Sequence, residues 1–415
     1  MRPRGILRLM DPSGSTVRRA GEPRGLEAAL LEHAHRFEAT FGRADRLRLF
    51  FAPGRVNLMG AHLDYNGGPV MPLAIDRGTF LAVRRRPDRR LRMRSTLDPR
   101  ELVLDLGEVV PPRAGRWFDY PAGVLRELLA AGGEGPGIDV LFGGNLPIGA
   151  GLSSSASICV GTAFALDSVW ELSLSPEARV EAALAAERGY VGVRCGIMDP
   201  FAVGLAREGH VLWLDCKDRS TRHIPLDSGA VRVAVADTGV RRELAWGAFN
   251  QRVAEARAAF EALARHVPGA VCLRDIPLAT LERHAQELDP VVARRAEHVL
   301  REVQRTFEAR DALLAGDLCA FGRRMLEAHR SLRDLYEVSV AELDALVEAA
   351  EAEQGVLGAR LTGAGFGGCV AMLLSSAAPE GTLERIAGLF ARRFGASPAI
   401  EVFGGDPGPR EVVLA

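Results

Sequence analysis

The sequence contains almost no lysine. Lys217 is the single lysine, although lysine and arginine together number 52 in the 415 residues. A phosphate-binding loop of the G-x-x-x-x-G-K-[ST] kind requires its lysine, and no such motif is present. The sequence also lacks an apolar run of 18 residues, which excludes an obvious membrane-spanning helix. A nucleotide would therefore have to be held by backbone amides, hydroxyl groups, arginine and a metal ion.

Closely spaced cysteines and an excess of either charge are also missing. The six cysteines show neither zinc-site spacing nor the density of a disulfide framework, so we expect reduced thiols and a cytoplasmic location. The net charge of −1 implies no strongly basic face, so nucleic acid is not expected as a partner. Residues 1–23 carry arginines but no apolar segment of a secretory signal, and we expect a disordered extension there.

The apolar pattern mixes helices and strands without a strict βαβ repeat. Strand-like runs occur at 47–51, 70–75 and 231–237, whereas 26–41, 177–191 and 338–351 have helical spacing. This pattern favours an α+β fold over a doubly wound sheet. A polar stretch near residue 220 predicts an N-terminal domain at 24–220 and a C-terminal domain at 221–415.

Residues 54–68 form the segment richest in chemistry. An arginine, two asparagines, a histidine and an aspartate stand among four glycines, directly after an apolar run at 47–52. Polar groups on a tight turn at a strand end can hydrogen-bond a small polyhydroxylated ligand closely. This predicts a sugar-like ligand at the turn.

Two glycine-rich segments predict contact with phosphate. Residues 147–157 place glycines and three consecutive serines before an apolar helix, so the loop amides and the helix N-terminus favour an anion. The same residues are also typical of a flexible loop in which a serine caps the N-terminus of the helix. Residues 361–370 satisfy G-x-G-x-x-G through Gly363, Gly365 and Gly368. Because these glycines follow a predicted helix and open a strand, we interpret them as close backbone packing beside a ligand rather than a dinucleotide fingerprint.

Asp199 stands in an apolar setting, in Cys195-Gly-Ile-Met-Asp199-Pro-Phe. Taken alone, it fits a turn former before Pro200 as well as a general base.

Together these motifs, in this order, resemble the GHMP kinase superfamily, and within it the galactokinase branch. Further matching stretches are 116–117, 186–187, 209–215 and 329–339, so the resemblance runs from about residue 26 to the C-terminus. It implies a two-domain α+β fold with the active site in the interdomain cleft. It also implies an enzyme of carbohydrate metabolism that binds ATP and Mg²⁺ and transfers the γ-phosphoryl group to the anomeric hydroxyl of a sugar.

The resemblance carries site roles onto particular residues. Asp199 matches the catalytic base and Arg55 the arginine beside it, while Ser155 and Glu187 match Mg²⁺ ligands. The sugar contacts implied are His62, Asp64, Ala61, Gly196 and Phe249. The ATP contacts implied are Pro147, Gly149, Gly151, Leu152, Ser153, Ser154, Ser155 and the adenine-stacking Trp117, with Gly363, Gly365 and Gly367 as near-ligand glycines.

Two departures from the family pattern fall on the sugar side. Galactokinases usually carry glutamate where Ala61 stands, near the 6-hydroxyl, and tyrosine where Phe249 stands. Because a site without these polar groups no longer demands that hydroxyl, the substrate could be galactose or a sugar altered at C6, such as galacturonate. The alternatives are a non-catalytic sugar sensor and a GHMP kinase for another small alcohol. We expect sugar and ATP as the only partners, no membrane, and a monomer or weak homodimer.

Overall fold

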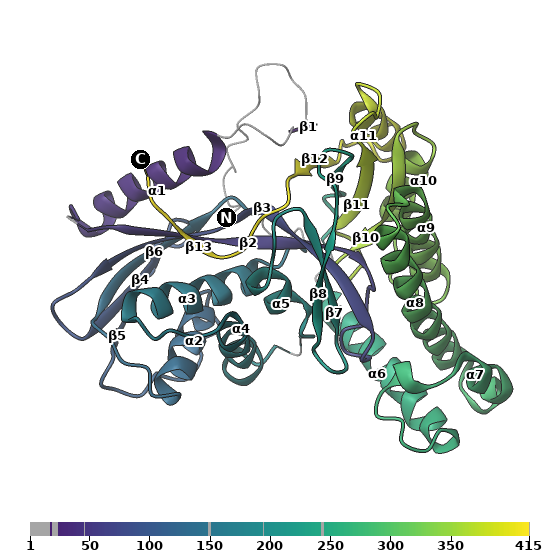
Figure 1. The fold of residues 1–415 in the computed structure, drawn as a ribbon, viewed down its shortest axis with the longest axis horizontal. Helices are drawn as coiled ribbons and strands as arrows, with labels where there is room; N and C mark the ends of the chain where they lie inside the picture. The colour runs from purple at the N-terminus through teal and green to yellow at the C-terminus, as the bar shows by residue number, and fades with distance from the viewer. Residues whose placement is uncertain are drawn as a thin grey trace.

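The computed structural model describes residues 17–18, 24–44, 46–147, 151–193, 195–241 and 245–414. Within these ranges the strands form two sheets, with helices packed on them (Figure 1). None of the helices in the described ranges combines the length and the apolar character needed to cross a membrane. The extension expected at 1–23 lies outside the described residues, except that Val17–Arg18 form the short strand β1.

The first sheet is built from the N-terminal part of the chain and one strand from its end. Its order is β13-β2-β3-β6-β4-β5, and β7 and β8 continue it from β3. The strands are β2 Arg48–Met59, β3 Pro69–Arg85, β4 Arg90–Ser95, β5 Leu102–Asp105, β6 Ile138–Gly144, β7 His210–Asp215, β8 Thr221–Pro225 and β13 Arg410–Val412.

Alternation along β2 explains the helices on both faces of this sheet. Successive strand side chains point to opposite faces, so Phe51 packs in the cluster of α1, whereas Phe50 packs in the cluster of α2 and α3. In Figure 1, α1 lies on one side of the sheet and α2 to α5 on the other. The helices are α1 Arg24–Phe41, α2 Asp119–Ala130, α3 Ser154–Trp170, α4 Pro176–Ala185 and α5 Met198–Gly204.

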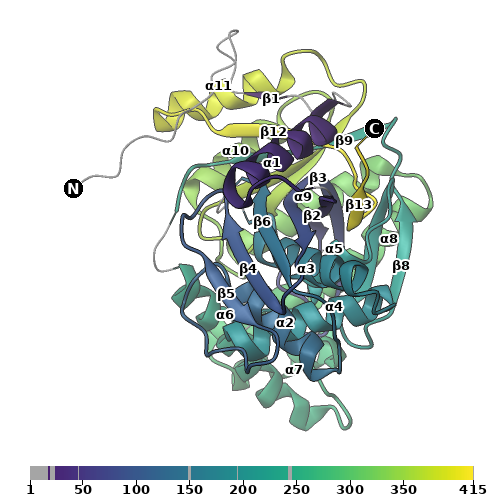
Figure 2. The same ribbon diagram turned by 90° about the vertical axis from the view of Figure 1, so that its left-hand side faces the viewer.

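The second sheet has the order β1-β12-β9-β11-β10. Its strands are β9 Val231–Asp237, β10 Val356–Thr362, β11 Cys369–Ser375 and β12 Ala399–Phe403, besides β1. The helices of this half are α6 Ala245–Leu263, α7 Leu278–His284, α8 Pro290–Leu314, α9 Leu318–Asp334, α10 Ala341–Glu351 and α11 Thr382–Phe394. Figure 2 shows α11 and β12 at one end of the molecule and α6 and α7 at the other.

The β2–β3 hairpin positions the turn predicted to bind sugar, and it corrects the predicted strand. The sequence pattern predicted a strand ending near residue 52, but β2 continues to Met59 because it pairs with β3 through two register shifts, at Pro53/Gly54 and Asn57/Met59. Arg55 therefore lies on the strand, and the turn begins at Gly60. Apolar side chains of the turn, Ala61 and Leu63, belong to the core built by the C-terminal helices.

Two further predictions on local structure need correction. The glycine cluster at 363–368 connects strand β10 to strand β11, so a strand rather than a helix precedes it. The predicted helix 177–191 ends at Ala185 and continues as a π-helical turn over Ala186–Val191. The polar stretch expected to divide the chain is the tight turn of the β7–β8 hairpin. The domain boundary at residue 220 stays a prediction.

Candidate active site

Two adjoining cavities lie between the N-terminal and C-terminal halves. The first, of about 240 Å³, is bordered by the turn after β2, the start of α5, the π-helical turn and the start of α6. The second, of about 450 Å³, is bordered by the loop before α3 and by the β10–β11 connection. Both cavities are lined by Arg55, Ser155, Asp199, Gly363 and Ala364. These shared residues mark where a ligand in one cavity would meet a ligand in the other.

Arg55 and Asp199 form a bidentate ion pair at this junction. Arg55 Nε donates to Asp199 Oδ1 at 2.7 Å, and Arg55 Nη2 donates to Oδ2 at 2.7 Å. The Ser153 hydroxyl also donates to Oδ2. A carboxylate has about four acceptor positions, so these three donors leave one for another group. The guanidinium is buried, whereas Asp199 is partly exposed toward the cavities.

The glycine–serine loop is held against β2 by hydrogen bonds from the backbone and the side chain of Arg55. Arg55 N–H donates to the Leu152 carbonyl at 3.1 Å, and Arg55 Nη1 donates to the Gly151 carbonyl at 2.6 Å. A Cβ at Gly54 would lie 2.7 Å from the Leu152 oxygen, so only glycine permits this approach. Ser153 adopts the left-handed conformation, with φ of 62°, directly before α3 begins at Ser154. The second cavity thus opens at the N-terminus of a 17-residue helix, a favourable position for phosphate.

Glu187 projects from the π-helical turn into the first cavity. Its side chain is buried, and its Oε2 atom has no hydrogen-bond partner. Burial raises the pKa of Glu187 to about 7, with a smaller contribution from the charge of Asp199, while a hydrogen bond from Ser155 acts in the opposite direction. A buried, unpartnered carboxylate oxygen beside a serine hydroxyl fits a hard cation such as Mg²⁺.

Asp64 also lines the first cavity. Burial, and secondarily the charge of Asp199, raise the pKa of Asp64 to about 6. A Cβ on Gly196 would lie only 1.4 Å from Asp64 Oδ2, so the carboxylate rests directly against this glycine. The Cys195 carbonyl accepts hydrogen bonds from Arg188 Nε at 3.1 Å and Nη2 at 2.8 Å, which hold the residue next to Gly196 in place.

The remaining wall of the first cavity is aromatic and apolar. His62 lies 5.9 Å from the Phe249 ring, and Tyr65 lies 5.6 Å from the same ring, between centroids. Ala61 is 3% exposed and offers only a methyl group. Burial lowers the pKa of His62 to about 3, so its imidazole is neutral, and its Nε2 atom is buried without a partner.

The residues predicted from the sequence are largely brought together. The first cavity is lined by Arg55, Ala61, His62, Asp64, Ser155, Glu187, Gly196, Asp199 and Phe249. The second is lined by Arg55, Pro147, Gly151, Leu152, Ser153, Ser154, Ser155, Asp199, Gly363, Gly365 and Gly367. Gly149 lies outside the described residues.

Trp117 is the predicted residue that borders neither cavity. Its ring lies 5.4 Å from that of Phe142 and packs at the edge of the core of the first sheet. Its Nε1 atom is buried without a partner. Its stacking on adenine stays a prediction.

Several lining residues were missed from the sequence. Asn57, Thr362 and Arg241 border the cavities, and the Thr362 hydroxyl donates to the Asn57 carbonyl at 3.2 Å. Asn57 stands two residues after Arg55 and shares its strand face, but this signal was missed because the strand was expected to end near residue 52. Arg241, whose Nη1 donates to Asp237 Oδ1 at 2.8 Å, follows β9 and carried no motif.

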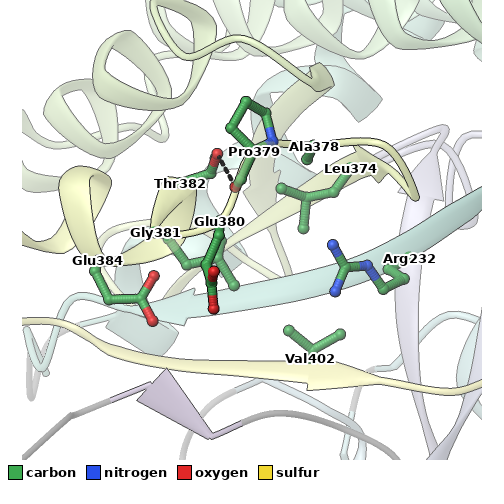
Figure 3. A pocket seen from close by; sticks show the side chains of 10 residues that line it. Arg232, Leu374, Ala378, Pro379, Glu380, Gly381, Thr382, Glu384 and Val402 are labelled. Atoms are coloured by element: carbon green, nitrogen blue, oxygen red, sulfur yellow. Dashed lines mark hydrogen bonds between the residues drawn. The ribbon is translucent and has the colours of Figure 1, made fainter.

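A third cavity, of about 210 Å³, lies beside the second sheet, between Arg232 on β9 and the segment that leads into α11 (Figure 3). The Thr382 hydroxyl on its wall donates to the Pro379 carbonyl at 2.8 Å, so this polar group is already satisfied within the wall. None of the site residues predicted from the sequence lines it.

Three family models match parts of this chain. Residues 35–85 match the galactokinase galactose-binding signature, 119–207 the GHMP kinases N terminal domain, and 309–391 the GHMP kinases C terminal domain. The chain is 42% identical to a galactokinase of Chloroflexus aggregans over 340 residues, which are 82% of this chain and 87% of that protein. It is 38% identical to a galactokinase of Exiguobacterium sibiricum over 91% of this chain and 96% of that protein.

Solved structures agree with these matches. The crystal structure of Lactococcus lactis galactokinase complexed with galactose superposes with a TM-score of 0.88 at 32% identity, covering 92% of this chain and 100% of that one. A mevalonate kinase superposes with a TM-score of 0.60 at 19% identity, over 86% of this chain and 99% of that one. This second likeness concerns the fold alone.

Proposed function

The chain belongs to the galactokinase family of GHMP kinases, and we propose that it transfers the γ-phosphoryl group of ATP to the anomeric hydroxyl of galactose, or of a galactose-like sugar altered at C6. The predicted resemblance, the α+β GHMP kinase fold and the assignment as a kinase are confirmed by the family matches. The observation that carries the finer proposal is the junction of two cavities at the Arg55–Asp199 pair.

In this proposal Asp199 accepts the proton of the anomeric hydroxyl. Asp199 borders both cavities with one free acceptor position, and the two hydrogen bonds from Arg55 hold its carboxylate in place. The same guanidinium is close enough to stabilise negative charge on a phosphoryl group in transfer. Asp199 and Arg55 are therefore the residues that touch the reacting atoms.

ATP would occupy the second cavity. The amides of the glycine–serine loop and the N-terminus of α3 suit its phosphates, which is consistent with a chain that has a single lysine. Ser155 and Glu187 would hold Mg²⁺, which neutralises phosphate charge when bound. Gly363, Gly365 and Gly367, each with positive φ, let the backbone approach closely.

The sugar would occupy the first cavity, with Asp64 and His62 toward its hydroxyl groups. Among the described residues that line this cavity, Arg55 is the one cationic side chain, and it is already paired with Asp199. A sugar carboxylate at C6 would thus find no described free counter-ion, which favours galactose over galacturonate. Ala61 and Phe249 favour the second candidate, a sugar that lacks or replaces the 6-hydroxyl, because they place no polar group there.

The test is a comparison of kcat/KM for galactose, galacturonate, glucuronate and arabinose, with homoserine and mevalonate as other small alcohols. A preference for galactose of roughly tenfold or more, or about 1.4 kcal/mol in the transition state, supports galactose as the substrate. The reverse preference supports the C6-altered sugar. Binding of ATP and sugar without phosphorylation of any compound would contradict the proposal and support a sensor.

A further inference from the structure

The turn that carries the sugar-facing residues is supported by helices far away in the sequence. The Gly60 N–H at its start donates to Glu302 Oε1 on α8 at 3.2 Å. Inside the turn, Asn66 Nδ2 donates to the His62 carbonyl at 2.8 Å. The turn and the C-terminal helices therefore form one unit around His62.

A chain of hydrogen bonds joins His62 to the segment after α9. His62 Nδ1 is 2.9 Å from the Tyr65 hydroxyl, and the Tyr65 hydroxyl is 2.8 Å from the Tyr336 hydroxyl. Tyr336 is fully buried, and its ring lies 4.9 Å from the His62 ring, between centroids. The last link connects residues that are 271 positions apart.

Tyr336 is itself fixed from several directions. Its carbonyl accepts a hydrogen bond from Arg252 Nε at 2.7 Å, and its N–H donates to the Ser331 carbonyl at 3.0 Å. Arg295 Nη1 holds the preceding Leu335 carbonyl at 2.6 Å. The Tyr336 hydroxyl is thus a fixed point, and the hydrogen-bonded chain ties His62 Nδ1 to it through Tyr65.

His62 has reason to need such a fixed point. It adopts the left-handed conformation, with φ of 61°, which is uncommon for a residue other than glycine. Its ring is neutral, so one nitrogen carries the proton and the other does not. Because Nδ1 is tied to the tyrosine hydroxyls, the hydrogen-bonding role of Nε2 in the cavity wall follows from the state of that chain.

We propose that Tyr336 is a positioning residue for the sugar: acting through Tyr65, it fixes the orientation and the tautomer of His62. This inference rests on the proposed sugar kinase function, and it adds a residue that touches neither the sugar nor ATP. It also gives a role to the 329–339 stretch, which matched the family without an assigned chemistry.

The first test is Tyr336→Phe, which removes one hydroxyl and keeps the ring. We expect the KM for the sugar to rise about five- to tenfold, with kcat and the KM for ATP within about twofold of wild type. The matched control is Tyr190→Phe, because the Tyr190 hydroxyl is also internally bonded, to the Pro111 carbonyl at 2.5 Å, and borders neither cavity. The control should leave the KM for the sugar unchanged.

The second test asks whether the effect passes through His62. In a His62→Ala background, Tyr336→Phe should change kcat/KM for the sugar by less than about twofold, because the ring to be positioned is gone. Tyr65→Phe breaks the same chain in the middle and should reproduce the rise in KM, so the test survives poor folding of the Tyr336 variant. Independent, multiplicative effects of the His62 and Tyr336 changes would overturn the inference.

Failure of this inference differs from failure of the proposed function. If wild type phosphorylates a sugar but Tyr336→Phe and Tyr65→Phe leave its KM unchanged, only the positioning role is wrong. If wild type phosphorylates no sugar, the proposed function is wrong and the positioning role is overturned with it.

Discussion

The two cavities of the site are built in different ways. The wall of the second cavity, where we propose that ATP binds, comes mainly from backbone and hydroxyl groups of two short glycine-rich loops. The wall of the first cavity, where we propose that the sugar binds, comes from buried side chains, and residues more than 200 positions away support it. In the function that we propose, the first design would recognise the phosphates, a feature common to all nucleoside triphosphates. The second depends on individual side chains, so a substitution there can change which sugar fits.

The largest expected effect lies at Asp199, where the two cavities meet. Asp199→Asn removes the proton acceptor but preserves the shape of the side chain, so kcat should fall about 10²- to 10⁴-fold. Binding of sugar and ATP, measured by calorimetry, should stay within about tenfold, since each cavity keeps its own walls. Asp227→Asn, an exposed aspartate outside both cavities, is the control. A kcat within tenfold of wild type would exclude Asp199 as the base.

The next prediction tests Glu302, which supports the turn at Gly60 from a distant part of the chain. Glu302 and Arg360 are both fully buried, with Arg360 Nη1 at 3.6 Å from Glu302 Oε1. Burial lowers the pKa of Arg360 to about 10 even with Glu302 nearby. Glu302→Gln leaves that cation without a counter-charge, and the free energy of unfolding should fall by about 3–5 kcal/mol.

The control for this change lies on the same helix. Glu297 accepts a hydrogen bond from Arg301 Nε at 2.8 Å in an exposed pair, so Glu297→Gln should cost less than about 0.5 kcal/mol in urea denaturation. Equal losses for the two variants would contradict the claim that the sugar turn depends on buried charge.

The two cavities also differ in how much of each could be predicted from the sequence. The loops around Gly151 and Gly363 act through local backbone geometry, so their residues could be predicted from short motifs. Tyr336 and Glu302 reach the sugar turn only through tertiary packing, across 271 and 242 positions, and no local pattern indicates such contacts. The extension of β2 through Arg55 was missed for a related reason, because it depends on pairing with β3.

The third effect concerns the carboxylate that we assign to the metal. Because burial raises the pKa of Glu187 from 4.5 to about 7, the folded protein holds this proton more tightly than the unfolded chain does. Without Mg²⁺, the protonated form of Glu187 therefore favours the folded state more than the ionised form does. This contribution to the free energy of unfolding is fully present below pH 4.5 and is lost as the pH rises to about 7. Above pH 7 the buried charge costs about 3 kcal/mol, so Glu187→Gln should be more stable than wild type at pH 8 by roughly that amount.

This comparison is made by urea denaturation in a chelator at pH 5 and pH 8. Glu181→Gln on α4, whose partner Arg219 is exposed, should not change the pH dependence. Identical pH dependence of wild type and Glu187→Gln would contradict the buried, ionisable site. Activity of Glu187→Gln should also require a higher Mg²⁺ concentration.

The smallest of these effects separates the two cavities most cleanly. Gly196→Ala would place a methyl group against Asp64, so the KM for the sugar should rise at least about tenfold while the KM for ATP stays within about twofold. Gly388→Ala on α11, where a Cβ meets only the end of Arg392, is the matched control. A rise in the KM for ATP as large as that for the sugar would show that the two sides are not independent.

The central claim is that a phosphoryl group crosses the Arg55–Asp199 junction onto the anomeric oxygen of a sugar. The most direct measurement is ³¹P NMR of the product formed from galactose, ATP and Mg²⁺, followed by an assay for reducing sugar. We predict one phosphate ester coupled to the anomeric proton, with loss of the reducing end in proportion to ADP formed. An ester at another hydroxyl, or ADP released without any sugar phosphate, would contradict the account.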